Sequence, residues 1–220
     1  MEQLLISLPV LIFSVVVHEV AHAYVARTQG DNTAFMLGRI TLNPLPHLDP
    51  LGSVLLPGIM ALTTNGGAIL GWAKPVPVNP RNFRNYKRGD ILVSLAGVAS
   101  NFVLAVLFTV LLVATYAAFR AFPGAGRSWA VLEAMFFEGI RINFLLAIFN
   151  LIPIPPLEGS HVMAHLLPVR VAVKYRELGR YGMLILIALL FLGGLAFVYW
   201  PVQFLTGGAL ALARSLAGVA

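Results

Sequence analysis

Long apolar segments dominate this sequence and limit the folds that it can adopt. The chain of 220 residues is 59% hydrophobic and only 11% charged, and its mean hydropathy is +0.85. A soluble domain of this size cannot bury so much apolar surface, whereas a bilayer accommodates helices of about 20 mostly apolar residues. We therefore expect an all-α membrane protein.

Several of the apolar segments are long enough to cross a bilayer as helices. The clear segments are 3–27, 91–119, 132–152 and 183–200, and the uncertain ones are 51–71 and 202–219. This pattern predicts a multi-pass helical bundle of about 4–6 spans, which forms a single domain over residues 1–220. Prolines and glycines in 33–50 and near 66–71 indicate short extended or β segments and re-entrant loops, which protein must shelter inside a membrane.

Basic residues are concentrated in two segments beside the apolar ones, and the formal net charge is +6. One segment holds Lys74, Arg81, Arg84, Lys87 and Arg88, and the other holds Arg170, Lys174, Arg176 and Arg180. Basic loops of membrane proteins face the cytoplasm and meet anionic lipid. We therefore expect a multi-pass protein of the inner cell membrane, whose charges meet the lipid bilayer and not nucleic acid.

The first apolar segment contains a histidine pair with a glutamate beside it. His18 and His22 are four residues apart, so in a helix both imidazoles lie on one face, with Glu19 next to them. This H-E-x-x-H pattern is typical of metalloproteases, although short motifs also arise by chance. Ionisable residues cost roughly 2–3 kcal/mol each inside a membrane and are tolerated mainly at functional sites. The pattern predicts one zinc ion per chain and Glu19 as general base.

A third zinc ligand is expected elsewhere, because catalytic zinc sites usually have three protein ligands and an open position. The sequence has no cysteine, so imidazole and carboxylate groups must hold the metal. Three prolines interrupt the segment from Asn150 to Gly159 just before Glu158. Helices 3–27 and 132–152 are both expected to run toward the cytoplasm, which brings their late residues to similar depth. We predict Glu158 as the third ligand, in a site toward the cytoplasmic side.

Two asparagines are candidates for contact with the substrate. Asn101 lies in a predicted span, where it either makes an interhelical hydrogen bond or donates to the substrate carbonyl and the oxyanion formed from it. Asn150 either has the same role or caps the interrupted helix. Asn143 is interpreted as a packing residue.

Other ionisable residues receive simpler interpretations. Glu133 and Glu138 belong to the beginning of the 132–152 segment, at the far end from Glu158, and are expected to be interfacial charges. His161 and His165 repeat the spacing of four residues but have no glutamate between them. We expect them to have surface or interfacial roles.

Together these residues make the sequence resemble the site-2 protease family of intramembrane zinc metalloproteases, in its compact bacterial form. The resemblance covers nearly the whole chain and rests on His18-Glu19-Val20-Ala21-His22, on Gly38 to Pro44 with His47 to Gly52, on Ser94 to Gly97 with Asn101, and on Asn150 to Gly159. It implies that two histidines and a later carboxylate hold zinc, that the glutamate activates water, and that the substrate is a membrane-anchored protein.

Two positions depart from the family pattern. The family usually has aspartate where this chain has Glu158, and proline where it has Val98. Glutamate also serves as the third ligand in His₂Glu zinc sites, so zinc binding is still expected.

Two other functions remain as alternatives. One is a catalytically weak or inactive membrane scaffold with the same fold. The other is a membrane di-iron oxidoreductase, because Glu19-x-x-His22 and Glu158-x-x-His161 both fit a Glu-x-x-His pattern.

Overall fold

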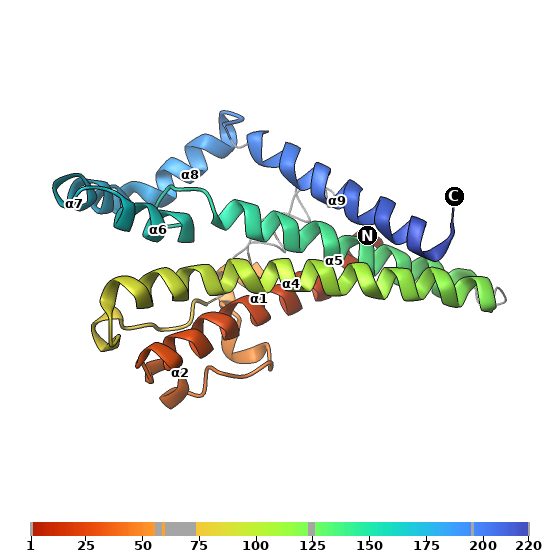
Figure 1. The fold of residues 1–220 in the computed structure, drawn as a ribbon, viewed down its shortest axis with the longest axis horizontal. Helices are drawn as coiled ribbons and strands as arrows, with labels where there is room; N and C mark the ends of the chain where they lie inside the picture. Colours follow the sequence, from red (N-terminus) through yellow and green to blue (C-terminus); the bar gives the residue numbers. More distant parts are fainter. Residues whose placement is uncertain (1, 56–58, 60–73, 123–125, 195, 220) are drawn as a thin grey trace.

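The computed structural model describes residues 2–55, 59, 74–122, 126–194 and 196–219. Three long helices pack side by side: α1 (Glu2–Gln29), α4 (Tyr86–Ala121) and α5 (Gly126–Asn150). A fourth long helix, α9 (Ala196–Ala217), lies across α4 and α5, as Figure 1 shows. Among the described residues, three helices are long and apolar enough to cross a membrane, namely Leu5–Gln29, Tyr86–Ala121 and Ala196–Ala217. The expected class of all-α membrane protein is confirmed.

Shorter helices connect the long ones. They are α2 (Thr33–Met36), η1 (Leu45–His47), η2 (Pro50–Leu55), η3 (Pro80–Asn82), α6 (Glu158–Leu166), α7 (Val169–Glu177), η5 (Leu178–Tyr181) and α8 (Gly182–Phe191). The described residues contain no strand. The β segments expected in 33–50 are therefore not found there, because α2 and η1 form local hydrogen bonds. The backbone nitrogen of Lys74 donates to the carbonyl of His47, but this bond is not part of a strand pair. Of the segment 51–71, only 51–55 and Ile59 belong to the described residues.

The boundary between the last two predicted segments differs from the expectation. The sequence places it at Pro201, between 183–200 and 202–219, but α8 ends at Phe191 and Pro201 lies inside α9. Gly193 has a φ of 71°, a left-handed conformation that ends a helix at little cost in a glycine. A proline in the second turn of a helix removes one backbone hydrogen bond, and here the helix continues through it. With 10 residues, α8 is too short to cross a bilayer as a helix.

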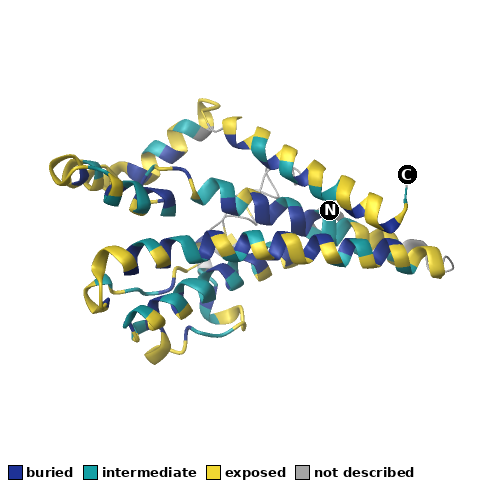
Figure 2. Cartoon of the chain, in the orientation of Figure 1, coloured by how far each residue is buried: buried dark blue, intermediate teal, exposed yellow. Residues whose placement is uncertain are grey.

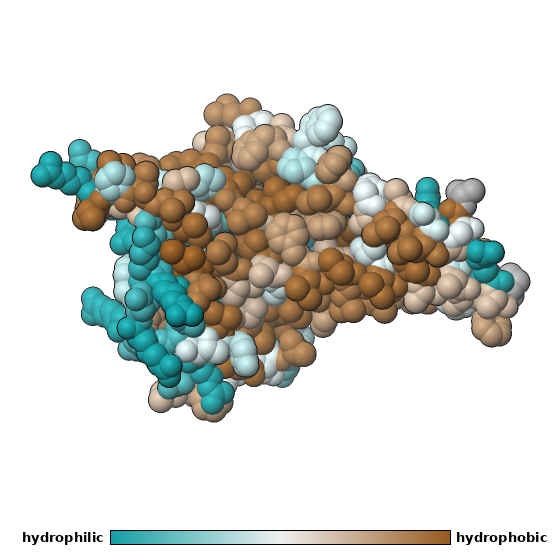
Figure 3. All heavy atoms as spheres, viewed as in Figure 1, coloured by the Kyte–Doolittle hydropathy of each residue, from teal (hydrophilic) through white to brown (hydrophobic). Residues whose placement is uncertain are grey.

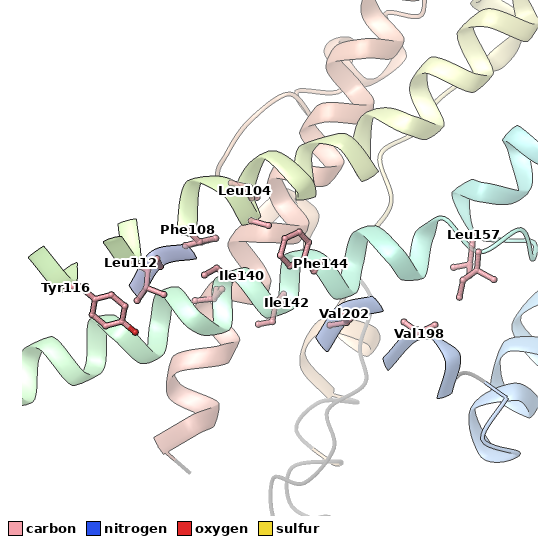
Figure 4. Packing of buried hydrophobic residues seen from close by; sticks show 14 of the residues in the cluster. Leu104, Phe108, Leu112, Tyr116, Ile140, Ile142, Phe144, Leu157, Val198 and Val202 are labelled. Carbon is pink, nitrogen blue, oxygen red and sulfur yellow. The ribbon is translucent and has the colours of Figure 1, made fainter. Parts of the chain in front are cut away.

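The core lies between α4 and α5, where buried residues line the facing sides of the helices and exposed residues face outward (Figure 2). Leu112 and Ile140 are completely buried there, and Phe108 and Phe144 pack beside them (Figure 4). A Cβ on Gly139 would lie 2.5 Å from the ring of Phe108. Gly139 therefore allows the two helices to approach closely, as small residues do in membrane proteins.

One end of the molecule is hydrophilic and the middle is apolar. Figure 3 shows a hydrophilic band over the end where α7 and the beginning of α4 lie, and a mostly hydrophobic surface along the long helices. The two basic segments flank these elements, so they share one end of the bundle. This arrangement is the one expected when a single membrane face carries both segments.

Candidate metal centre

Helix α1 places the two histidines of the H-E-x-x-H pattern on one face. The Nε2 atoms of His18 and His22 are 3.0 Å apart, and their rings meet edge to face with centroids 4.6 Å apart. Gln29 is the last residue of α1, and at 1.5 Å per residue His18 lies about 16 Å and His22 about 10 Å before the end of the helix. The site therefore lies within a candidate membrane span.

A tight turn brings Glu158 to the same point. Glu158 begins α6, and its Oε1 lies 2.6 Å from Nε2 of His18 and 2.9 Å from Nε2 of His22. A Cβ on Gly159 would lie 2.1 Å from the carbonyl oxygen of Leu151, so only glycine allows the turn to fold back this closely. Within the described part of the chain, these three residues form the one group with the spacing of metal ligands.

A chain of buried hydrogen bonds fixes which nitrogen of His18 carries the proton. The Nδ2 of Asn143 donates to the carbonyl of Gly139, which can only accept, so its Oδ1 must face Asn101. Asn101 donates from Nδ2 to that oxygen and presents its own Oδ1 to Nδ1 of His18 at 2.6 Å. His18 therefore donates from Nδ1, which leaves Nε2 with a free lone pair when the ring is neutral. Ser14 completes the chain by accepting from Asn143.

The second histidine is oriented in the same way. Nδ1 of His22 lies 2.7 Å from the carbonyl oxygen of Val93, which can only accept a hydrogen bond. His22 therefore also carries its proton on Nδ1 and directs the lone pair of Nε2 at Glu158. The amide oxygen of Asn101 thus fixes the tautomer of His18, and the backbone oxygen of Val93 fixes that of His22. In both rings Nε2 is the nitrogen available to a metal.

The three facing atoms fit a zinc ion. Two imidazole lone pairs and a carboxylate oxygen repel one another unless a cation lies between them. Tetrahedral zinc would hold such atoms about 3.3 Å apart, roughly 0.3–0.7 Å more than the distances of 2.6, 2.9 and 3.0 Å observed here, so the side chains would move apart slightly on binding it. The Oε2 of Glu158 is also buried without a hydrogen-bond partner among the described residues. The donor set of two imidazoles and one carboxylate is a common catalytic zinc set.

Gly97 of α4 makes room for the two imidazoles. A Cβ at this position would lie 2.5 Å from Cε1 of His18 and 2.5 Å from Nε2 of His22. Real Cβ atoms do not approach other atoms so closely. The histidine rings therefore rest directly on the backbone of α4.

Glu19 faces a cavity of about 490 Å³ next to the two histidines. Its Oε2 accepts a hydrogen bond of 2.6 Å from the backbone nitrogen of Val76, in the segment 74–79 that crosses in front of α1. This hydrogen bond fixes Oε2, and Oε1 can accept a proton from a water molecule in the cavity. The residues that line the cavity come from five parts of the chain and include His18, Glu19, His22, Pro75, Val76, Asp90, Ser94, Asn150, Glu158 and His161.

The structure separates the two candidate asparagines. Asn101 is 0% exposed and is absent from the cavity wall, because it lies behind His18 and bonds to Nδ1 on the side away from Glu158. It makes the interhelical hydrogen bond to Asn143, which is the first of its two predicted roles, and its role as a donor to the substrate or oxyanion stays a prediction. Asn150 lines the cavity, and its Nδ2 donates to the carbonyl of Leu146 in its own helix.

Several ionisable residues have partners that the sequence did not indicate. Glu138 is buried and forms an ion pair of 2.6 Å with Arg141, and Glu133 accepts a hydrogen bond of 2.8 Å from Tyr116. Glu138 therefore lies inside the bundle and is not an interfacial charge, whereas Glu133 is exposed and its interpretation as an interfacial charge stays a prediction. Asn143, interpreted as packing, belongs to the network that orients His18. Its only sequence signal was a polar residue in a predicted span.

The two later histidines also have a specific partner. His161 and His165 both contact the buried Asp90 of α4, and His161 lines the cavity. The expectation of surface or interfacial roles is therefore wrong for His165, whose side chain is 7% exposed. The available signal was a lone acid, Asp90, directly after a basic segment.

Comparisons with known proteins agree with this geometry. The family model described as "Peptidase family M50" matches residues 6–193. The curated "Putative zinc metalloprotease YwhC" of Bacillus subtilis is 39% identical over 191 residues, which cover 87% of this chain and 82% of the relative. "Putative zinc metalloprotease Rip2" is 31% identical in Mycolicibacterium smegmatis, over 88% of this chain and 71% of the relative, and 32% identical in Mycobacterium tuberculosis strain H37Rv, over 85% and 69%. No solved structure matches the chain significantly.

Proposed function

Because the chain belongs to peptidase family M50, the site-2 protease family, and is a zinc metalloprotease of the membrane, we propose that it cuts membrane-anchored proteins within or beside the bilayer. One zinc ion per chain is held by His18, His22 and Glu158, and Glu19 is the catalytic base. The observation that carries the proposal is the convergence of Nε2 of His18, Nε2 of His22 and Oε1 of Glu158 at one point, beside Glu19 of α1, which is long enough to span a membrane.

The cavity provides the setting that peptide hydrolysis needs. When bound, zinc supplies a Lewis acid that polarises the scissile carbonyl and makes water a better nucleophile. Glu19 takes a proton from the attacking water as the C–O bond forms and the carbonyl electron pair moves to oxygen. The C–N bond then breaks, its electron pair stays on nitrogen, and Glu19 passes the proton to that nitrogen. The backbone nitrogen of Val76 keeps the carboxylate in place during both transfers.

The position of the site supports action on membrane-anchored substrates. By helix geometry the two histidines lie about 10 and 16 Å before the end of α1. Both basic segments gather at the end toward which α1 runs, so the positive-inside rule favours an inner cell membrane protein with its site toward the cytoplasm. In such an orientation, a substrate span meets the cavity from the bilayer and water enters from the basic end.

The two alternative functions fit the geometry less well. A di-iron centre uses the glutamate and the histidine of both Glu-x-x-His pairs as ligands, but Glu19 accepts a hydrogen bond from the backbone of Val76 and His161 bonds through Nδ1 to Asp90. The family assignment also identifies a zinc metalloprotease. An inactive scaffold does not require a carboxylate beside the two histidines, yet Oε1 of Glu158 lies within 3 Å of Nε2 of both.

The proposal is tested with purified protein in lipid vesicles and a tagged single-span substrate. We expect wild type to cut the substrate and Glu19→Gln to keep its zinc but lose cleavage, because only the base is removed. His22→Ala loses both zinc and cleavage. Glu177→Gln, which changes an exposed acid on α7, serves as the matched control and keeps both.

Two results would contradict the proposal. Cleavage by Glu19→Gln at the wild-type rate would remove Glu19 as the base. Mass spectrometry of the products locates the cut, and a cut far from the membrane-spanning part of the substrate would refute action within or beside the bilayer.

A further inference from the structure

Asp90 is a buried acid that both later histidines contact. It lies near the beginning of α4, is 7% exposed, and directs one carboxylate oxygen at each partner. Oδ1 is 3.2 Å from Nδ1 of His161, and Oδ2 is 2.7 Å from Nε2 of His165. The two histidines are one helical turn apart on α6, the helix that begins with Glu158. Asp90 therefore joins α4 to the helix that carries the third zinc ligand.

The two histidines differ in what they face. The side chain of His165 is 7% exposed and packs against the ring of Tyr86, with centroids 5.5 Å apart. The side chain of His161 is 50% exposed and lines the cavity that also contains Glu19 and Glu158. His165 fits a structural role, whereas His161 is open to a substrate.

The contact with Asp90 uses only one nitrogen of the His161 ring. Because Nδ1 bonds to Asp90, Nε2 remains for a group in the cavity. His161 follows Glu158 by three residues, and side chains three residues apart are neighbours on a helix surface, with Cβ atoms about 5–6 Å apart. His161 and the third zinc ligand therefore lie on neighbouring parts of the wall of one cavity, which is where a bound peptide carbonyl would be placed.

We propose that Asp90 and His161 form a catalytic dyad in which Nε2–H of His161 donates a hydrogen bond to the oxygen of the scissile carbonyl as that oxygen gains negative charge. The inference rests on the proposed function, since it needs a peptide bond at the zinc site. As water adds, the carbonyl electron pair moves to the oxygen, and His161 stabilises the charge without giving up its proton. This is the role that sequence analysis considered for Asn101.

The charges around His161 favour the protonated ring that such a donor requires. The hydrogen bond to Asp90 raises the pKa of His161 above its usual value of 6.5, and burial opposes this effect. The negative charges of Asp90 on α4 and Glu158 on α6 also raise the pKa, while Arg176 on α7 lowers it. A protonated ring keeps Nδ1–H on Asp90 and presents Nε2–H to the cavity at the same time.

Two substitutions separate catalysis from support of α6. His161→Asn keeps a nitrogen near the place of Nδ1, and so keeps the contact with Asp90, but has no group at the place of Nε2. His161→Gln retains a donor at the distal place. We expect His161→Asn to lower kcat about 100-fold, the usual effect of losing one oxyanion donor, with little change in KM or bound zinc. His161→Gln should recover at least a tenth of the wild-type kcat.

A matched control and a binding measurement complete the experiment. His165→Gln changes the other histidine that contacts Asp90, and this variant should keep the wild-type kcat. A phosphinic peptide, whose tetrahedral anionic phosphorus group imitates the attacked carbonyl, should bind His161→Asn about 100-fold more weakly than wild type. Asp90→Asn combined with His161→Asn should lower kcat no further than His161→Asn alone, because the two residues act as a unit.

The outcomes distinguish this inference from the proposed function. If His161→Asn cuts within threefold of the wild-type kcat and binds the phosphinic peptide as tightly, the dyad is refuted. If it loses zinc in parallel with activity, His161 only supports α6 and the dyad is also refuted. Failure of the proposed function would give a different result, because Glu19→Gln would then cut the substrate as wild type does.

Discussion

Gly97→Ala should prevent zinc binding while leaving the helical bundle intact. The new methyl group would lie 2.5 Å from atoms of both His18 and His22 and 2.6 Å from Nε2 of His18. Ordinary contacts of a Cβ atom begin near 3.4 Å, so the rings must move by about 1 Å. Zinc ligands tolerate deviations of only about 0.2 Å from ideal distances. We expect zinc affinity to fall at least 100-fold, or about 2.7 kcal/mol of binding free energy.

The same substitution at a position away from the histidines provides a matched control. Gly208 lies in α9, and a Cβ there would meet nothing within 4 Å. Replacing a glycine inside a helix by alanine raises the free energy of unfolding by up to about 1 kcal/mol. Gly208→Ala should therefore keep full zinc binding. A loss confined to Gly97→Ala then comes from the histidine rings and not from the helix.

The assay is equilibrium dialysis of the detergent-solubilised protein against a zinc-buffered chelator, followed by measurement of zinc per chain. Thermal unfolding with and without zinc gives a second readout, because a ligand that binds only the folded state raises the melting temperature. Wild type and Gly208→Ala should show this rise, and Gly97→Ala should not. Binding by Gly97→Ala within twofold of wild type would refute the arrangement of His18 and His22 described above.

Three further changes test other parts of the structure. Asn101→Leu removes the acceptor for Nδ1–H of His18 and should weaken zinc binding about 10–100-fold in the same dialysis, with unchanged helical content by circular dichroism. Glu158→Asp withdraws the carboxylate by about 1.5 Å while Gly159 keeps α6 in place, so zinc should bind at least tenfold more weakly; equal affinity would mean that α6 shifts freely. Asp31 is buried, which raises its pKa, but hydrogen bonds from Thr33, Asn79 and Asn82 lower it overall below the usual 3.8. Its stabilisation is therefore present above pH 3.8 and is lost as the pH falls through the lowered value. The difference in melting temperature between wild type and Asp31→Asn should therefore shrink as the pH falls below 3.8 and disappear below the lowered pKa.

Local spacing was enough to predict the first part of the site. His18, Glu19 and His22 lie within one helical turn, so the period of the helix alone places both imidazoles on one face. Glu158 was predicted from a break in an apolar segment followed by an acid, together with the need for a third ligand. The structure brings these side chains together, and their assignment as zinc ligands remains a proposal.

No sequence pattern predicted the contacts between residues on different helices. Asn143 orients His18 through Asn101, although each asparagine lies on a different helix from the histidine. Asp90 and His161 are 71 residues apart in the chain, and the pair depends on α6 packing against α4. No periodicity in the sequence indicates which buried polar groups will meet.

The sequence by itself determined the membrane class, the family resemblance and the zinc-binding face of α1, because apolar length and helical period are properties of neighbouring residues. Only the tertiary structure decided which tautomer each imidazole adopts, that Gly97 supports both rings, and that Asp90 pairs with His161. A buried donor or acceptor must find a partner wherever the packed helices place one, and that choice is made by the whole fold.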